Sequence, residues 1–194
     1  MKMKKFAWPM IMALAFMVLV GGGCSLTSTD DEEGDENEAE EVTEYDSNWT
    51  SAIDKEGIAE TEVDGTINEQ EVDIVDVQIK KWDDEYSWSF SDLAPSDTCG
   101  VVVDNDAVNF SSKILEMGTF EKKMEDEIEF DDYHAYYHYE QDDGTPMSVN
   151  VSWSAKIVVT EIDTENNKVK GYAKIDFEDG KTMIDGMFEA DLCE

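Results

Sequence analysis

Two histidines and the acids around them are the residues whose types and spacing could bind a metal ion. His134 and His138 are the only histidines in the chain, and Glu140 follows the second by two positions. On a helix, a spacing of four would place both imidazoles on one face, within reach of a shared zinc ion. On a strand the same spacing separates them by about 13 Å, because each residue advances the chain by about 3.3 Å. If the segment is a strand, the two histidines cannot share an ion, and the segment is predicted to be a solvated polar face. The metal candidate that remains as the alternative is His138 with Glu140 and a further ligand from elsewhere.

Alternation of polar and apolar residues indicates that this segment is a strand and that others resemble it. A period of two is typical of half-buried antiparallel strands. One of these strands alternates serine with the aromatic residues Tyr86, Trp88 and Phe90. This aromatic row is predicted to face the core, in preference to forming a platform for sugar stacking. The segments with this period are 75–80, 86–91, 133–140 and 147–154.

Turn signals between the strands define the fold class. Asp179-Gly180 lies between two strand-like runs, and this pair favours a hairpin because both residues tolerate a positive φ. It predicts that 169–177 pairs with 181–193. Helical periodicity is confined to a turn or two around 120–127. Residues 48–194 are enough for one domain with its own core. We therefore predict a single all-β domain, an antiparallel β-sandwich or, alternatively, a partly closed β-barrel.

The first 24 residues have the layout of a secretory signal. Three lysines precede the apolar run Phe6–Val20, and Gly21–Gly23 supplies small residues directly before Cys24. The run is shorter than the roughly 20 residues of a spanning helix. A cysteine after small residues resembles the lipobox of bacterial lipoproteins, although Gly21 occupies the place where that motif usually has leucine.

This resemblance implies a signal peptide over 1–23, which is removed, and lipid, including palmitate, on Cys24. The protein would then be attached to the bacterial cell envelope through covalent lipid, at the outer membrane or the cell surface. Several acyl chains make such an anchor stable, since each buried methylene contributes about 0.8 kcal/mol. An uncleaved anchor and an ordinary secretory signal are the alternatives.

The stretch after Cys24 predicts a disordered tether over 24–47. Between Asp30 and Asp46 it contains eleven acidic residues, no basic residue and few apolar ones. Such a segment cannot offset the entropy lost on ordering, and self-repulsion extends it. In some bacterial groups an acidic stretch after the lipidated cysteine resembles a signal for export to the cell surface.

With Cys24 lipidated, Cys99 and Cys193 are the two remaining cysteines. In an exported domain an even pair is most simply a disulfide bond, because compartments outside the cytoplasm permit oxidation. Two buried free thiols and a catalytic thiol are the alternatives. Neither cysteine has a histidine near it in the sequence.

The charge of the chain excludes some partners. The formal net charge is −34, and three of the 14 basic residues precede Cys24, so the remainder carries −37 without any arginine. Binding to nucleic acid requires a basic face, and this chain is not expected to bind it. The acidity is typical of a very soluble protein, as in a saline habitat.

The C-terminal part resembles the ends of uncharacterised all-β lipoproteins of Gram-negative bacteria. The likeness is carried by Thr160–Asp163, Val169–Tyr172, Asp179-Gly180 and Asp185–Phe188, followed by Cys193. It implies an all-β architecture and no particular activity.

These features predict a lipid-anchored cell-envelope protein that presents one β-domain in a binding or structural role, with no catalysis evident and no cofactor implied. The alternative is a module that binds a glycan or a divalent cation, or a hydrolase without a recognisable motif. Exposed aromatic residues clustered beside acids would favour the alternative. An acidic surface over buried aromatic residues would favour the first function. The sequence names no partner protein or glycan.

Overall fold

The computed structural model describes residues 48–102, 104–128 and 132–193. The predicted signal peptide, Cys24 and the tether therefore lie outside the described residues. Within the described ranges every regular element is a strand. The strands are β1 (Trp49–Thr50), β2 (Asp64–Ile67), β3 (Gln70–Asp73), β4 (Asp76–Trp82), β5 (Glu85–Ser91), β6 (Ala107–Ser112), β7 (Gly118–Lys122), β8 (Tyr133–Glu140), β9 (Pro146–Val149), β10 (Trp153–Asp163), β11 (Lys168–Phe177) and β12 (Met183–Cys193).

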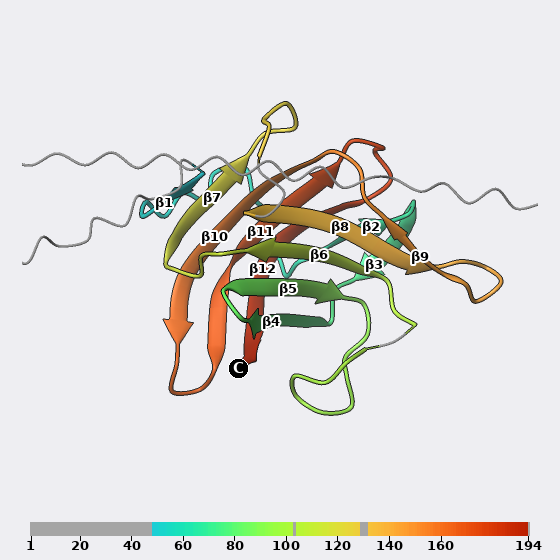
Figure 1. Cartoon of the computed structure of the whole chain (residues 1–194), viewed down its shortest axis with the longest axis horizontal. Coiled ribbons are helices and arrows are strands. Elements are labelled where there is room, and N and C mark those ends of the chain that lie inside the picture. Colours follow the sequence, from blue (N-terminus) through green and yellow to red (C-terminus); the bar gives the residue numbers. More distant parts are fainter. Residues whose placement is uncertain (1–47, 103, 129–131, 194) are drawn as a thin grey trace, which may run out of the picture. The chain divides into compact units, whose positions relative to one another are not determined.

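All the strands belong to one sheet with the order β1-β7-β10-β11-β12-β4-β5-β6-β8-β9, and the β2–β3 hairpin pairs with β12 beside this path. Neighbours pair antiparallel except β12 and β4, which run parallel. The first part of β12 pairs with β2, and its last residues, Asp191–Cys193, pair with β4. The end of the chain is therefore fixed in the middle of the sheet (Figure 1).

The sheet curls so that its two halves pack face to face. In Figure 1 strands β4, β5, β6 and β8 run across the picture, in front of the steeper β10, β11 and β12. Aromatic rings contact one another between the halves: Trp88 lies 5.9 Å from Phe188, and Tyr137 lies 5.0 Å from Phe177, between ring centroids. The all-β prediction is confirmed. The two facing halves are a feature of a sandwich. The hydrogen-bonded pairing that continues through every strand of the order from β7 to β8 is a feature of a partly closed barrel.

Local turn chemistry explains the hairpins. Gly180 has a φ of 67° in the turn between β11 and β12, which confirms the predicted closing hairpin. Asn68 and Glu69 have φ values of 49° and 67°, and they form a two-residue connection between β2 and β3. Positive φ at both central residues is the geometry that matches the twist of paired strands.

Two details of the predicted secondary structure are wrong. The alternating segment 147–154 is not one strand, because β9 ends at Val149 and β10 begins at Trp153. At 150–152 the chain passes from one half of the sheet to the other, because β9 pairs with β8 whereas β10 pairs with β7 and β11. Trp153, the first residue of β10, is buried and stacks with Phe120 of the neighbouring β7. The region 120–127 contains no helix: its first residues pair in β7 with β10. None of the described segments includes a helix long and apolar enough to cross a membrane.

Candidate functional site

The strands β4, β5, β6 and β8 have one face in the core and a polar face that points away from it, which we call the outer face. Strand register arranges its side chains in rows. One row runs from Gln78 through Ser89 and Asn109 to Tyr136. The neighbouring row starts at Lys80 and Ser87. Alternation along each strand alone places these polar groups together.

The long loop 92–106 connects β5 to β6, and its described residues, 92–102 and 104–106, cover part of the outer face. Gln78 and Asn109 are only 3% and 7% exposed, although they lie on a polar face. The loop and the strands enclose a partly open cavity of about 190 Å³. Its lining consists mainly of hydroxyl, amide and charged groups: Asp76, Gln78, Lys80, Ser87, Ser89, Gly100, Val101, Val102, Asn105, Asn109 and His138.

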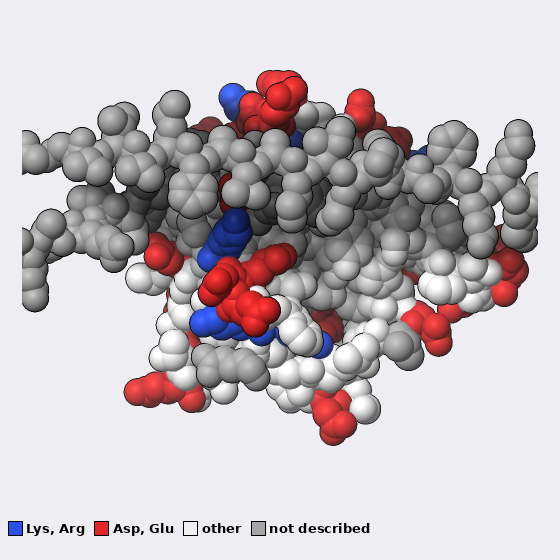
Figure 2. Space-filling view, viewed as in Figure 1, with Lys and Arg blue, Asp and Glu red and all other residues white. Residues whose placement is uncertain are grey.

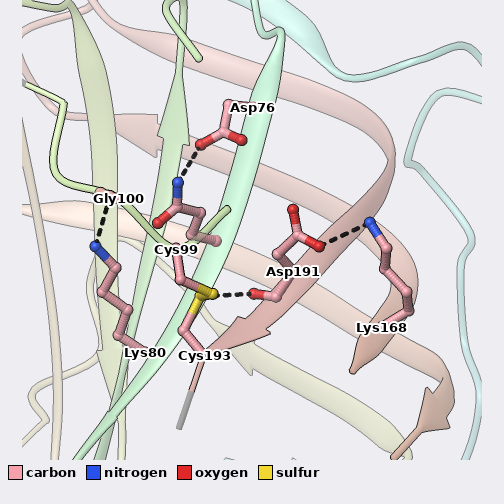
Figure 3. The surroundings of a disulfide bond; sticks show 8 residues. Asp76, Lys80, Cys99, Gly100, Lys168, Asp191 and Cys193 are labelled. Atoms are coloured by element: carbon pink, nitrogen blue, oxygen red, sulfur yellow. Dashed lines mark hydrogen bonds and ion pairs between the residues drawn. A yellow bond between two sulfur atoms is a disulfide. The ribbon is translucent and has the colours of Figure 1, made fainter. Parts of the chain in front are cut away.

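A disulfide bond holds this loop against the sheet. Cys99 is bonded to Cys193 with 5.6 Å between their Cα atoms, which confirms the predicted pairing (Figure 3). The parallel pairing of β12 with β4 brings Cys193 beside Lys80. The Lys80 ammonium in turn donates a hydrogen bond of 2.9 Å to the carbonyl oxygen of Gly100, the residue after Cys99. Two adjacent loop residues are thus fixed, one covalently and one by a charged donor.

The opposite end of the loop is held by a hydrogen-bond chain through His138. Asn109 Nδ2 lies 3.0 Å from His138 Nδ1, and His138 Nε2 lies 3.1 Å from Asn105 Oδ1. Since Asn105 Nδ2 donates to Ser91 Oγ at 2.7 Å, the amide oxygen of Asn105 must accept from the ring. The network therefore assigns the imidazole proton to Nε2.

This imidazole is neutral near physiological pH. Burial lowers the pKa of His138, and the negative charges of Asp106 and Asp92 oppose that shift. A protonated ring would lose the acceptor at Nδ1 that Asn109 requires. Burial and the hydrogen bonds thus favour the same protonation state.

The carboxyl group in the cavity is also shifted towards its neutral form. Burial raises the pKa of Asp76, the hydrogen bond from Gln78 lowers it, and the charge of Asp191 adds to the rise. Gln78 Nε2 donates to Asp76 Oδ2 at 2.8 Å. Asp191 is itself paired with Lys168 at 2.8 Å, as Figure 3 shows.

The candidate metal ligands are not brought together into a site. His134, Tyr136 and His138 follow one another along the outer face of β8, with ring centroids 5.6 and 6.5 Å apart. Both ring nitrogens of His138 face amides, and Glu140 is exposed. Among the described residues no three His, Cys, Asp or Glu side chains form a group that could hold a metal ion.

The aromatic row on β5 belongs to the core, as predicted. Trp88 and Phe90 are fully buried, and Tyr86 packs against the core while partly exposed. Trp82, at the turn after β4, is the large aromatic side chain that is most exposed among the described residues. The described part of the chain therefore has no exposed aromatic cluster of the kind that would mark a sugar-stacking platform.

The charges of the domain are interspersed. Lysine side chains pair with acids, including Lys156 with Asp54 at 2.8 Å and Lys174 with Asp185 at 3.0 Å. On the face shown in Figure 2, the visible lysines are seen beside acidic side chains. The described residues on that face show no extended basic surface.

Sequence reasoning missed most residues of the cavity. Ser87 and Ser89 were visible as the polar half of an alternating strand, a pattern shared by any solvated face. Gln78, Asn105 and Asn109 had no signal of their own. The length of 92–106 was the available signal, since long loops without regular structure are usually functional or disordered.

Comparison of the chain with protein-family models, with curated proteins and with solved structures gives no match. The lipobox and the C-terminal likeness therefore stay predictions from the sequence. The function has to be argued from the site.

Proposed function

We propose that this protein is a lipid-anchored protein of the bacterial cell envelope, at the outer membrane or cell surface, and that its β-domain acts in binding rather than catalysis. Cys24 would carry the lipid after removal of residues 1–23. Residues 24–47 would form the acidic tether between the lipid and the domain.

The observation that carries this proposal is the Cys99–Cys193 disulfide. Stable disulfides form in oxidising compartments and are rare in the cytoplasm. The bond joins positions 94 residues apart and holds a loop in place, as expected of a structural bridge. It supports export, which the lysines and apolar run before Cys24 independently predict.

The cavity beneath the loop favours binding over purely structural support. A loop that only covered the sheet would need no space beneath it, whereas this one leaves about 190 Å³ among polar side chains. The imidazole at the cavity has both nitrogens in hydrogen bonds, so it is not poised as a general base. This favours a binding module over a hydrolase without a recognisable motif. The absence of a metal-binding group among the described residues gives no support to a cation-binding module.

The anchor is tested in the bacterium that produces the protein. Intact-mass measurement of the membrane fraction should find a mature chain that begins at Cys24 and carries lipid. Cys24→Ser should leave an unprocessed precursor without the lipid mass, and Ser25→Ala is the matched control that should be lipidated normally. A mature form that begins elsewhere would contradict the proposal. So would a Cys24→Ser protein that is processed and membrane-bound like the wild type.

A further inference from the structure

The cavity under loop 92–106 contains hydrogen-bonding groups that the other described residues leave unused. Ser87 and Ser89 line it from neighbouring outward positions of β5, and neither hydroxyl makes a hydrogen bond within the described part of the chain. Gln78 uses its amide nitrogen on Asp76, and Asn109 uses its own on His138. Their amide oxygens remain as acceptors beside the serine hydroxyls.

The loop is held over these groups in an uncommon backbone conformation. Cys99 and Asp104 have φ values of 62° and 61°, a left-handed conformation that non-glycine residues seldom adopt. Ser87 and Ser89 are nevertheless partly exposed, so their hydroxyls stay accessible to solvent and to a ligand that enters the cavity.

The charges around the cavity favour a neutral ligand. Its one ammonium group, on Lys80, uses one of its three N–H donors on the carbonyl of Gly100. Its one lining carboxyl, on Asp76, offsets that positive charge, so the described lining has no net formal charge. Neither an anion nor a cation would meet a net opposite charge in the cavity. The remaining lining groups can donate hydrogen bonds to hydroxyls and accept hydrogen bonds from them.

The size of the cavity sets the size of the ligand. At about 30 Å³ for each water, the cavity of about 190 Å³ holds roughly six waters, or one compact polar molecule. Val101 and Val102 lie at the same cavity from the loop side; Val101 is 80% exposed, and the partly buried Val102 supplies the apolar surface. Pyranose rings combine these features, because they carry hydroxyls around the edge and C–H groups on the faces.

We propose that this cavity binds one neutral sugar unit, held by Ser87, Ser89 and Gln78 and bordered by Val102. The unit is either a free monosaccharide or the end of a glycan. The inference rests on the proposed binding role of the domain and is independent of the lipid anchor.

Saturation-transfer difference NMR on the full-length lipidated protein tests this site, in a detergent without a sugar headgroup. The probes are methyl α-D-glucopyranoside, methyl β-D-galactopyranoside and N-acetyl-D-glucosamine, each also offered as the end unit of a trisaccharide. We expect saturation transfer to at least one probe. Transfer to the small probe alone indicates a free monosaccharide, and transfer to both indicates a glycan end.

The variant Ser87→Ala/Ser89→Ala should bind roughly tenfold more weakly, since two hydrogen bonds are lost. Ser111→Ala, on the same face but outside the cavity, should bind within about twofold of the wild type. Thermal unfolding of each variant verifies that it is folded. Absence of transfer to every probe would overturn the proposal, as would equal binding by the double variant. Neither result would bear on the lipidation of Cys24.

Discussion

The two faces of the β4–β5–β6–β8 half are both covered, but with opposite chemistry. On the inner face Trp88 is fully buried against Phe110 and Phe188, and its indole nitrogen donates to Ser112. On the outer face Gln78 and Asn109 are almost as buried, beneath a loop that leaves space over them. The inner face is filled to stabilise the fold. The outer face is partly covered without being filled, and the space beneath the loop is where we propose that a ligand binds.

The largest effect is expected from emptying the inner face. Trp88→Ala should destabilise the domain by about 3–5 kcal/mol, because it removes a fully buried indole and leaves a cavity. Urea unfolding monitored by circular dichroism measures the loss. Trp82→Ala is the matched control: its side chain is 66% exposed, and the change should cost little. Equal losses in the two variants would contradict the assignment of the inner face as the core.

Breaking the disulfide that holds the loop over the outer face should have the next largest effect on stability. Cys193→Ser, or reduction of the wild type, should cost about 2–4 kcal/mol, since the bond constrains a long loop in the unfolded chain. The melting temperature should fall by several degrees, at about 2–4 °C for each kcal/mol. Reductant should have no further effect on Cys193→Ser. Thiol labelling of both Cys99 and Cys193 in denaturant without reductant would show that there is no bridge.

The hydrogen-bond chain through His138 should contribute less, and in a way that depends on pH. His138→Ala leaves the amides of Asn105 and Asn109 unpaired and should cost about 1–3 kcal/mol. In the wild type, burial lowers the pKa of His138 in the folded state, so the unfolded chain binds more protons as the pH falls. The stability contributed by this group is therefore complete above the ordinary histidine pKa of about 6.5 and is lost below it.

Unfolding measured between about pH 5.5 and 7 tests this, because most carboxylates titrate at lower pH. The wild type should become less stable as the pH falls through this range, and His138→Ala should show a weaker dependence. His134 also has a pKa lowered by burial and is the second contributor, so His134→Ala is the matched control. If the pH dependence of stability persists in His138→Ala and disappears in His134→Ala, His134 is the responsible group and the prediction for His138 is wrong.

The smallest effect on stability is expected for a residue of the outer face that loop 92–106 does not cover. Ser111 lies between Ser87 and His134 in its row and is partly exposed. Ser111→Ala should change the free energy of unfolding by less than about 0.5 kcal/mol. Unfolding in urea beside the wild type measures it. A loss as large as that of His138→Ala would mean that the whole outer face, and not the covered part, is structurally required.

Local chemistry in the sequence determined the strands and hairpins of this domain. Alternation at 86–91 and 133–140 gave strands β5 and β8, and Asp179-Gly180 gave the closing hairpin, because period two and positive φ are properties of neighbouring residues. The disulfide was also predictable from the sequence, because Cys99 and Cys193 are the two cysteines other than Cys24.

Only the tertiary structure decided the rest. Alternation could not show that residues 147–154 belong to two strands in different halves of the sheet. That division depends on the packing of Trp153 in a core whose other residues are distant in the sequence. Nor could alternation show that Ser89 lies beneath the loop whereas Ser111, on the same face, does not. That difference arises from the parallel pairing of β12 with β4, which brings Cys193 to the outer face and fixes loop 92–106 over it. Such contacts join residues far apart in the chain, and no local pattern encodes them.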